Sequence, residues 1–565
     1  MADTRFKQIP RANTKMEESL NFIEAIIEED ILNQAYNEGI ATRFPPEPNG
    51  YLHLGHAKSI CLNFGLALKY KGRVNLRFDD TNPERESSDY VDAIKRDIRW
   101  LGFEWQDEFY ASDYFETLYG FAKKLIKKGL AYVDDSTSEE IAQQKGTPQV
   151  SGVANQYRER SVDENLLLFE AMKIGQFRDG DKVLRAKIDM GAANMHMRDP
   201  IMYRIKHASH HRTGKKWCIY PLYDFAHGQS DAIEHISHST CTLEFVAHRQ
   251  LYNWFITELQ LFPSKQIEFA RLNLAYTVMS KRKLQQLVEN GLVDGWDDPR
   301  LPTIAGLRRR GYTSHAIRDF CERIGVAKRD TTTDHNLLEF CVREDLNQSA
   351  QRRIAVLRPL KVVLTNYPEA ATEYIALQSL PGEEAKGSRE VPFGKELWIE
   401  QDDFMEHPTK NYFRLALGRM VRLKGAYIIL CEDIVKDQHN NITELHCKYF
   451  PETKSGNNPD NFKVKSTIHW LSIPQAVPAE IRLYGKLFNV ENPNELGEHF
   501  IDHFNNNSVR ILQNAYVEKD LSTQAYLGIH FQFIRLGYFI KDKNSNSDHL
   551  IFNRIVDLKD SSKKT

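Results

Sequence analysis

The segment PNGYLHLGHAKS (residues 48–59) decides how the first part of the chain folds. It follows a short strand-like run, Gly39–Phe44, and its Pro and Gly residues bend the backbone before an amphipathic helix over His56–Tyr70. The run VNLRF (74–78) then predicts a buried strand, and apolar residues at helical spacing predict a further helix up to Leu101. This strand–helix–strand–helix order predicts the first half of a doubly wound parallel sheet.

Two histidines stand at the start of the first predicted helix. His53 and His56 are three residues apart, close to the backbone N–H groups that a helix N-terminus leaves unpaired and that favour a phosphate. Neutral imidazoles can donate to phosphate oxygens without adding fixed charge. The alternative interpretation is a pair of histidines that only cap the helix.

The middle of the chain changes pattern twice. Residues 113–216 loosen into loops, helices and short strands, which indicates an insertion between two halves of the sheet. The runs WCIYPLYDFAH (217–227) and KQIEFARL (265–272) resemble returning strand ends, with a predicted helix over Ser239–Leu259 between them. Residues 280–350 are predicted to be helical.

A basic loop, TVMSKRKL (277–284), lies just beyond the predicted sheet. A lysine loop suits a reaction in which negative charge builds up on pyrophosphate as it leaves, because such catalysis consists mostly of positioning and charge stabilisation. Residues 271–360 carry 16 Lys and Arg against 11 Asp and Glu, while the whole chain has a net charge of −2. This local excess indicates either a surface for phosphate or RNA, or an ordinary solvated basic face.

Beyond residue 355 the segments become short, β-branched, aromatic and bounded by turns, which is typical of barrels or sandwiches. We predict antiparallel strands here, with the charged KDQHNN segment as a hairpin loop. The predicted strands are VVLTNY, KELWIE, YFRLAL, GAYIIL, NITELHCKYF, VKSTIHWL and EIRLYGKLF.

The composition excludes several classes of protein. A chain of 565 residues with 41% hydrophobic and 27% charged residues is too long for one core and too ordinary for a disordered, collagenous or membrane protein. We see no signal peptide. The seven cysteines are scattered and never form CxxC, so we expect free thiols in a reducing cytoplasm and no cysteine zinc site. A zinc site at His207, His210, His211 and Cys218 is also disfavoured, because a contact to nucleic acid explains this Lys- and Arg-rich stretch better.

Taken together, these segments resemble one known family. HLGH is similar to the HIGH signature of class I aminoacyl-tRNA synthetases, and VMSKRKL is similar to their KMSKS loop. The resemblance to the glutaminyl-tRNA synthetases and their close glutamyl relatives runs from about residue 35 to the FNR near 553. It is carried by RFPPEPNGYLHLGHAKSICLNFG, RFDDTNP, YPLYDFAH, SHSTCTLEF and ARLNLAYTVMSKRKL.

The resemblance implies an α/β Rossmann-type catalytic domain with an inserted acceptor-binding domain, a helical subdomain and two C-terminal antiparallel β-barrels. The corresponding division of the chain is an N-terminal helical extension (1–38), the two Rossmann halves (39–112 and 217–272), the acceptor-stem insertion (113–216), the helical subdomain with the MSK loop (273–351), a proximal anticodon-binding barrel (352–408 with 490–565) and a distal barrel (409–489).

It also implies the reaction of a glutamine–tRNA ligase in the cytoplasm. In the family the glutamine carboxylate attacks the α-phosphate of ATP and releases pyrophosphate, and the 2′-hydroxyl of the terminal adenosine of tRNA(Gln) then attacks the adenylate and releases AMP. Members of this branch generally need bound tRNA before they activate glutamine. The implied partners are tRNA(Gln), L-glutamine and ATP with Mg²⁺, with no dedicated protein site for the metal, no DNA, no membrane and a monomeric state.

Family roles carried over by position give the expected site. His53, His56 and Lys281 would be catalytic, while Arg43, Asp79, Tyr223 and Cys241 would bind glutamine. Asp79 follows a predicted strand, where open α/β sheets bind ligands, and its carboxylate would hold the α-ammonium. The ATP site would comprise Glu47, Pro48, Asn49, His53, Leu54, Gly55, His56, Ala57, Lys58, Ser59, Thr242, Arg271, Leu272, Met279, Ser280 and Lys281.

Cys241 is the expected discriminator between glutamine and glutamate. An amide donates two hydrogen bonds, whereas a carboxylate only accepts, so a buried neutral site disfavours glutamate. Glutamyl relatives typically carry an arginine where this chain has Cys241. The alternative is a small buried residue with no selective role.

The resemblance places tRNA contacts in the second half of the chain. Three positions depart from the family pattern: Asn411 where glutamine is frequent, Lys424 where arginine is frequent, and Ala247 where an aspartate often reads the acceptor stem. Lysine is a point charge and not a fork, so Lys424 can turn to phosphate. The expected contacts are Lys328, Arg329, Asp334, Arg352, Asn411, Arg414, Arg422, Lys424, Gln532 and Arg535.

Three other functions compete with this interpretation. A glutamyl-tRNA synthetase is disfavoured by Cys241, and a non-catalytic RNA-binding paralogue is disfavoured because His53, His56 and Lys281 are all present. A nucleotidyltransferase that shares HxGH leaves the β-rich half unexplained.

Overall fold

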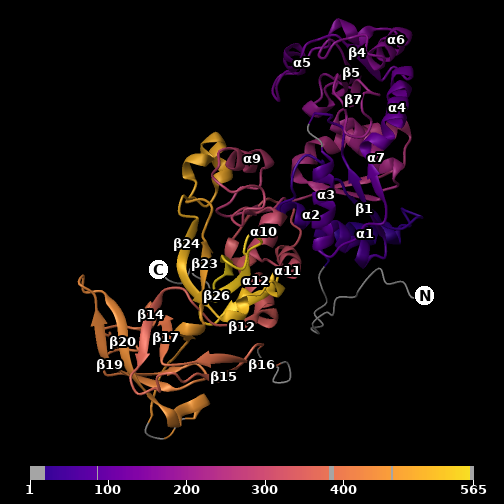
Figure 1. Cartoon of the computed structure of the whole chain (residues 1–565). Coiled ribbons are helices and arrows are strands. Elements are labelled where there is room, and N and C mark those ends of the chain that lie inside the picture. Colours follow the sequence, from indigo (N-terminus) through magenta and orange to yellow (C-terminus); the bar gives the residue numbers. More distant parts are fainter. Residues whose placement is uncertain (1–19, 85–86, 381–386, 458, 460–461, 560–565) are drawn as a thin grey trace.

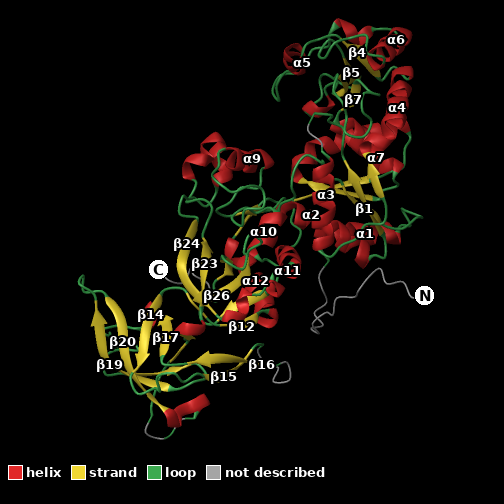
Figure 2. Cartoon of the chain, viewed as in Figure 1, coloured by secondary structure: helices red, strands yellow, loops and turns green. Residues whose placement is uncertain are grey.

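The computed structural model describes residues 20–559, apart from 85–86, 381–386, 458 and 460–461. The molecule is elongated, with the insertion (residues 113–216) at one end and the strands of residues 359–472, coloured orange, at the other; the yellow C-terminal strands lie between these and the central helices (Figure 1). Helices are most frequent up to about residue 350, whereas strands dominate the rest of the chain (Figure 2).

Three strands between Ala41 and Tyr110 form half of a parallel sheet, as predicted. Its strands are β1 (Ala41–Phe44), β2 (Arg73–Phe78) and β3 (Glu108–Tyr110), which pair in the order β1-β2-β3. The helices α2 (Leu54–Lys69) and α3 (Ser88–Trp100) connect them. The preceding helix α1 (Phe22–Leu32) buries Ile23 and Ile27 against side chains that include Phe269.

The second half of this layer contributes β8 (His238–Thr242) and β9 (Lys265–Phe269), a parallel pair. The helix α7 (Tyr223–Ile233) precedes them and α8 (Arg249–Leu259) connects them. β8 lies beside β1, because Ala41 N donates to Ser237 Oγ at 2.8 Å and Arg43 Nη1 donates to Thr240 O at 2.8 Å. In space the strands follow the order β3-β2-β1-β8-β9. The chain places β2 and β3 on one side of β1 and later places β8 and β9 on the other side. The topological switch point therefore lies between β1 and β8, and open α/β sheets bind ligands at such a point.

The insertion carries its own antiparallel sheet, in the order β4-β5-β6-β7. Its strands are β4 (Ala131–Asp134), β5 (Val183–Ala186), β6 (Ile201–Ile205) and β7 (Ile219–Pro221), and its helices are α4 (Phe115–Lys127), α5 (Ser138–Lys145) and α6 (Val162–Lys173).

Two predictions for the second half of the parallel layer were wrong. Residues 217–227 do not return to it, because β7 closes the insertion's sheet and α7 begins at Tyr223. The predicted helix over Ser239–Leu259 starts as β8, and only its second half is the helix α8. Short apolar and aromatic runs fit a core strand, an edge strand or a helix equally well, so periodicity alone could not decide between them.

Four helices occupy the centre of the molecule: α9 (Lys281–Glu289), α10 (Ile304–Arg310), α11 (Ser314–Ile324) and α12 (His335–Ser349). The short strands β10 (Asn273–Leu274) and β11 (Thr332–Thr333) pair in parallel beside them. The helical pattern predicted for residues 280–350 is therefore confirmed in outline.

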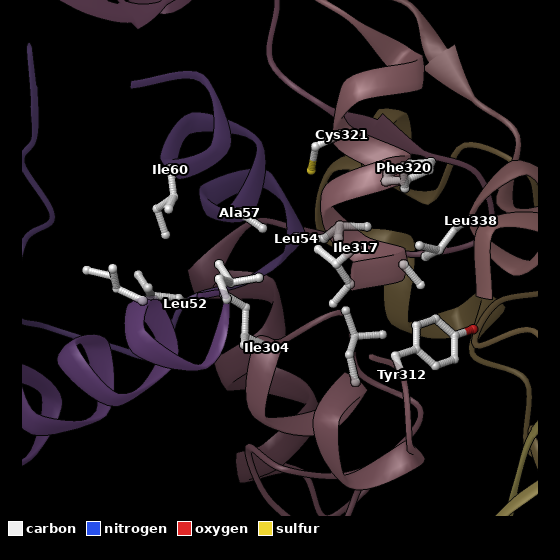
Figure 3. Close-up of a cluster of buried hydrophobic side chains, with 14 of the residues drawn as sticks. Leu52, Leu54, Ala57, Ile60, Ile304, Tyr312, Ile317, Phe320, Cys321 and Leu338 are labelled. Carbon is white, nitrogen blue, oxygen red and sulfur yellow. The ribbon is translucent and has the colours of Figure 1, made fainter. Parts of the chain in front are cut away.

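One apolar cluster joins α2 to the central helices. Leu54 and Ala57 of α2 pack with Ile304, Ile317 and Phe320 (Figure 3). The same cluster includes four side chains from the C-terminal strands: Tyr538, Ile540, Ile555 and Val556. The start of α2 is thus held by residues from both ends of the chain.

The C-terminal half forms two seven-stranded sheets, in the orders β21-β18-β19-β20-β14-β17-β22 and β12-β25-β26-β27-β23-β24-β13. The strands of the first are β14 (Pro359–Leu364), β17 (Glu396–Glu400), β18 (Met420–Leu423), β19 (Ile428–Lys436), β20 (Ile442–Phe450), β21 (Thr467–Ile468) and β22 (Leu471–Ser472). Those of the second are β12 (Gln351–Arg353), β13 (Ala355–Val356), β23 (Val477–Tyr484), β24 (Val509–Val517), β25 (His530–Phe533), β26 (Gly537–Lys541) and β27 (Leu550–Val556). β15 (Glu373–Gln378) and β16 (Ser388–Phe393) form a separate antiparallel pair.

Both barrel-like sheets are mixed, so the prediction of antiparallel barrels was wrong in this respect. Parallel pairs join β14 to β20, β18 to β21, β12 to β25 and β23 to β27. Side-chain alternation reports which face of a strand is buried and not the direction of its neighbour. The predicted hairpin at KDQHNN lies between β19 and β20, whereas YFRLAL contributes only isolated bridges at Leu415 and Leu417.

The strand pairing also groups residues differently from the predicted division. β14 and β17 pair within the sheet of the predicted distal barrel, while β23 pairs with β24 and β27 near the C-terminus. These pairings cross the predicted boundaries at 408 and 489. Among the described residues, no helix is both long and apolar enough to cross a bilayer.

The apolar cluster around α2 predicts a stability effect at Ile317, which is fully buried. Replacing Ile317 by Ala leaves a cavity and should lower the free energy of unfolding by about 2–5 kcal/mol. Ile317→Val, the matched control, should cost about 0.5–1.5 kcal/mol. Denaturant unfolding followed by tryptophan fluorescence measures both, and equal effects of the two substitutions would contradict the assigned packing.

Candidate active site

The HLGH segment begins α2 and is capped by its own histidines. His53 is the N-cap residue: its Nδ1 accepts from Gly55 N at 3.1 Å, while His56 Nδ1 accepts from His53 N at 3.1 Å. The ring centroids are 3.9 Å apart. The capping interpretation is therefore confirmed for Nδ1 of each ring, and it leaves Nε2 of each ring for another partner.

Both imidazoles are neutral at physiological pH. Burial, followed by the neighbouring His56 ring, holds the pKa of His53 well below its ordinary value. Burial also lowers the pKa of His56 to about 4, and the Lys281 cation acts in the same direction. Since Nδ1 accepts, the proton of each neutral ring lies on Nε2, so each ring can donate one hydrogen bond to a ligand.

The basic loop lies against this segment. Lys281 is the first residue of α9, and its side chain passes so close to Gly50 that a Cβ added there would lie 2.6 Å from Lys281 Cε. Met279 Sδ is 3.9 Å from the position of a Cβ at Gly55, and Lys281 Nζ lies 5.8 Å from the centroid of the Tyr90 ring. Two loops about 220 residues apart in sequence therefore form one positively charged, donor-rich surface.

Backbone pairing fixes the position of the HLGH segment. Leu54 N donates to Pro302 O and Ile304 N donates to Leu52 O, both at 2.9 Å. These bonds connect the segment to the turn before α10, so the central helices and α2 move together.

A buried network of charges lies at the switch point between β1 and β8. Arg43 Nε and Arg77 Nη1 both reach Asp231 Oδ1, at 3.0 and 2.8 Å, and all three side chains are fully buried. Arg77 Nη1 also lies 3.2 Å from Glu234 Oε1. Although burial opposes it, the Arg43 guanidinium holds the pKa of Asp231 well below its ordinary value, so this carboxylate stays charged.

Arg43 is almost saturated. Besides Asp231, it donates to Thr240 O at 2.8 Å and to Ser239 Oγ at 2.6 Å, and its Nη2 lies 3.1 Å from His227 Nε2. A guanidinium has five N–H donors, so one N–H on Nη1 stays available to a ligand.

Asp79 differs from its neighbours because half of its carboxylate is unpaired. Its Oδ1 accepts from Arg77 Nε at 3.0 Å, whereas its buried Oδ2 has no hydrogen-bond partner among the described residues. Burial raises the pKa of Asp79 to about 7, against the lowering effect of Arg77. An unpaired buried carboxylate oxygen fits a cationic ligand group, such as an ammonium.

Tyr223 and Cys241 lie beside this network. Tyr223 stacks on His227, with centroids 4.8 Å apart, and contacts Phe245 at 5.2 Å. Burial raises the pKa of Cys241 to about 12, so its thiol is neutral, although Arg43 acts in the opposite direction. Asp79, Arg43 and Cys241 all influence the pKa of Tyr223, which burial raises well above its ordinary value. The four predicted glutamine-binding residues therefore lie close together, in one buried cluster.

The remaining predicted ATP-site residues separate into two sets. Leu54, Ala57 and Leu272 are buried in the apolar cluster, so their side chains face the core, and only their backbone atoms can serve a ligand. Lys58 is also buried and donates to Ala270 O at 2.8 Å, which connects α2 to the end of β9. The other residues lie outside the apolar cluster. They are Glu47, which is bonded to Asn49; Pro48, whose carbonyl accepts from Ser87 N; Ser59 on α2; Thr242 at the end of β8; Arg271, which is paired with Glu244; and Ser280, the N-cap of α9.

The predicted tRNA contacts form two groups in the β-rich half. Arg352 and Gln532 are paired residues on β12 and β25, and Arg352 donates to Asn347 O at 2.8 Å. Arg414 and Arg535 share Asp403, at 3.2 and 2.6 Å. Arg535 is thus engaged by a carboxylate, which limits its freedom to read a base.

The other predicted contacts differ in exposure. Asn411 and Lys424 are exposed, whereas Arg422 is 8% exposed and donates to Thr453 O and Asn457 O, so it supports the backbone. Lys328 lies over the Phe22 ring, Arg329 is exposed, and Asp334 is the N-cap of α12.

Sequence reasoning missed Arg77, His227, Asp231 and Glu234 as site residues. All four are buried, and burial lowers the pKa of His227 to about 3, so its ring is neutral. The sequence did carry a signal for them: charged residues stand inside the apolar strand RVNLRF and along one face of a helix. Charged residues at such positions are buried only when they are paired, so this pattern indicates a buried ion-pair network.

The histidines of the insertion do not form the tetrad that a zinc site would need. His210 and His211 lie against Asp80, whose carboxylate also accepts from Ser112 N and Ser112 Oγ. His207 is instead bonded to Asp179, and Cys218 Sγ donates to Lys173 O. This network connects the end of β2 to the insertion.

Comparisons with known proteins identify the family of the chain. A family model for the catalytic domain of class I tRNA synthetases (E and Q) matches residues 39–348, and two models for their anticodon-binding domains match residues 350–450 and 467–542. A glutamine–tRNA ligase of Clostridium kluyveri is 54% identical over 549 residues, which cover 96% of this chain and 98% of that protein. One of Vibrio parahaemolyticus is 53% identical over 544 residues, with 96% and 97% covered. A solved glutamate tRNA ligase of Elizabethkingia meningosepticum overlaps 54% of this chain and 69% of its own, at 16% identity and a TM-score of 0.41.

The raised pKa of Asp79 predicts a pH-dependent stability effect. Because the folded chain binds this proton more tightly than the unfolded chain does, Asp79 lowers the stability of the protein as pH rises from about 4 through 7. Asp79→Asn should therefore have little effect near pH 4 and stabilise the unliganded protein at pH 8, by up to about 4 kcal/mol.

Denaturation midpoints at the two pH values measure this effect. The neighbouring Asp80→Asn is the control and should destabilise the protein at both, because Asp80 accepts two hydrogen bonds from Ser112. A loss of stability in Asp79→Asn at pH 8 would show that its ion pair with Arg77 outweighs the cost of burial.

Proposed function

The chain belongs to the class I aminoacyl-tRNA synthetases for glutamate and glutamine, and from this premise we propose how its residues divide the reaction. It is a glutamine–tRNA ligase, which joins L-glutamine to tRNA(Gln) at the expense of ATP. The observation that carries the proposed division of roles is the arrangement of two neutral Nε2–H donors and Lys281 on one side, and an unpaired Asp79 oxygen on the other.

The first group receives ATP. His53 and His56 donate from Nε2 to phosphate oxygens, and the positive end of the α2 helix dipole adds partial positive charge. As the α-phosphate–pyrophosphate bond breaks, negative charge grows on the leaving pyrophosphate, and Lys281 stabilises it. Mg²⁺ enters with the nucleotide and neutralises phosphate charge there, without a dedicated protein site.

The second group receives glutamine. Asp79 Oδ2 accepts from the α-ammonium, which also satisfies the buried oxygen, and the remaining Nη1–H of Arg43 faces the carboxyl end. Tyr223 contacts the side-chain amide. Held in this way, the carboxylate attacks the α-phosphate of ATP, and the adenylate and pyrophosphate form together.

The second step transfers the glutaminyl group to RNA. The 2′-hydroxyl of the terminal adenosine attacks the carbonyl carbon of the adenylate, and AMP leaves. The exposed side chains of the insertion and of the β-rich sheets hold the tRNA, with Arg352, Gln532, Asn411, Lys424 and Arg414 as proposed contacts. One chain carries all these groups, so we propose that it acts as a monomer.

We attribute selectivity for glutamine to the pairing of the arginines near the proposed glutamine site, which leaves none of those described free to neutralise a glutamate side chain. Arg43 and Arg77 are neutralised by Asp231, Glu234 and Asp79, and the Cys241 thiol is neutral. A glutamate side chain would therefore be a buried charge without a partner, which costs several kcal/mol. Aminoacylation of purified tRNA with each amino acid tests this, and preferential charging with glutamate would favour the glutamyl alternative.

The assigned role of Lys281 predicts a kinetic effect. Lys281→Ala should reduce the rate of adenylate formation by about 10²–10³-fold with little change in ATP affinity, because the stabilised charge develops only in the transition state. Pyrophosphate exchange in the presence of tRNA measures the rate, and equilibrium dialysis measures ATP binding. The adjacent exposed Arg282→Ala is the control and should be near wild type. Equal losses of rate and affinity would refute the assigned role.

The neutral thiol of Cys241 predicts a specificity effect. Cys241→Arg should lower the ratio of kcat/KM for glutamine to that for glutamate by at least about tenfold, since a paired charge is worth more than 1.4 kcal/mol at a buried site. Cys241→Ser keeps a small neutral side chain and should preserve the ratio. If the arginine variant also preserves the ratio, glutamine selectivity lies elsewhere in the pocket.

A further inference from the structure

Three residues that are remote in sequence meet at the boundary between the insertion and the parallel layer. His196 lies in the 3₁₀ turn Met195–Met197, Asp224 lies in the first turn of α7, and His248 ends the 3₁₀ turn Leu243–His248. One ligand atom of each side chain lies within 4.8 Å of the others. We propose that His196, Asp224 and His248 form a binding site for a zinc ion.

The two rings and the carboxylate are already held together. The imidazole centroids of His196 and His248 are 3.8 Å apart, and His248 Nδ1 lies 2.6 Å from Asp224 Oδ1. Asn194 connects the two turns, because its Nδ2 donates to Ala247 O at 2.8 Å and to Gln250 Oε1 at 3.1 Å. Little rearrangement is therefore needed before an ion can bind.

The ring nitrogens of His196 are available, whereas His248 Nδ1 and Asp224 Oδ1 are bonded to each other, so this pair would have to open toward the ion. Within the described parts of the chain, neither ring nitrogen of His196 makes a hydrogen bond. The side chains of His248 and Asp224 are 25% and 29% exposed, which leaves room for water at further coordination positions.

The second His-and-Asp cluster of the molecule shows what a structural arrangement looks like. In the group Asp80, His210 and His211, both ring nitrogens of His210 are used: Nδ1 accepts from Arg212 N and Thr213 N, and Nε2 lies 2.8 Å from Asp80 O. No lone pair is left for an ion. His196, in contrast, has ring nitrogens without a hydrogen bond among the described residues, so we place the metal at its cluster and not at that of His210.

The ligand set selects the kind of metal. Two imidazole nitrogens and one carboxylate oxygen suit Zn²⁺, whereas Mg²⁺ and Ca²⁺ prefer sites built from oxygen. The ion would join the insertion to the helix that begins with Tyr223, so it would stiffen one wall of the glutamine pocket. The metal site itself does not depend on the proposed roles of that pocket.

One nearby charge opposes the ion. The Lys145 ammonium acts on both His196 and Asp224, and it lies at the end of α5 in the insertion. A divalent cation binds less tightly near a positive charge, so removing this charge should strengthen binding.

The test uses full-length untagged protein from which metals have been removed with EDTA. Titration with Co²⁺, which reports tetrahedral coordination by its visible absorption, should show one equivalent bound, and Zn²⁺ should displace it. His196→Ala should weaken Co²⁺ binding at least about 100-fold, because it removes a direct ligand. His439→Ala removes an exposed histidine from the β19–β20 hairpin and should leave binding unchanged.

Lys145→Met provides a variant that should gain affinity, by about tenfold, so the proposal does not rest on a loss that misfolding could cause. Absence of a bound ion in the wild-type chain, or binding that is the same in His196→Ala and wild type, would overturn the proposal. In that case His248 and Asp224 form only an ion pair on which His196 stacks.

Discussion

Two arginines on neighbouring strands share one buried carboxylate, and the rest of the catalytic layer depends on that arrangement. Arg43 on β1 and Arg77 on β2 both reach Asp231 on α7. The removal of one member of such a group costs about 3–5 kcal/mol, because it leaves a buried charge unpaired. Asp79 directly follows β2 and α7 begins with Tyr223, so the shared carboxylate fixes the separation between the proposed ammonium and amide contacts.

Burial and pairing of charged side chains also explain why the surroundings of Asp231 and of α2 suit ligand groups of opposite charge. Around Asp231 the arginines are already paired with carboxylates, so the proposed glutamine site offers the neutral Cys241 thiol and the unpaired Asp79 Oδ2. Around α2 the histidines are neutral and the positive charge comes from the helix N-terminus and Lys281. In the proposed division of roles, burial and pairing thus direct the anionic substrate and the cationic end of the amino acid to separate places.

The local parts of this structure could be predicted from the sequence. HLGH and VMSKRKL marked the two loops that meet, and helical spacing located α2, because these patterns depend on residues close together in the chain. The direction of neighbouring strands in the β-rich half, the Arg43–Asp231–Arg77 group and the cluster of His196 with Asp224 and His248 could not be predicted. Each depends on contacts between segments whose separation in sequence carries no periodic signal.

The apolar cluster that holds α2 has a consequence for the synthesis of the protein. Its members include Leu54 from the HLGH segment and Ile555 from β27, so the core that orients the catalytic helix is completed by one of the last strands to be made. While the ribosome is still translating residues before 550, the cluster lacks part of its covering and exposes apolar surface to solvent. A nascent or prematurely ended chain is thus a natural target for chaperones and proteases, because α2 packs against a complete core only once β27 has been made.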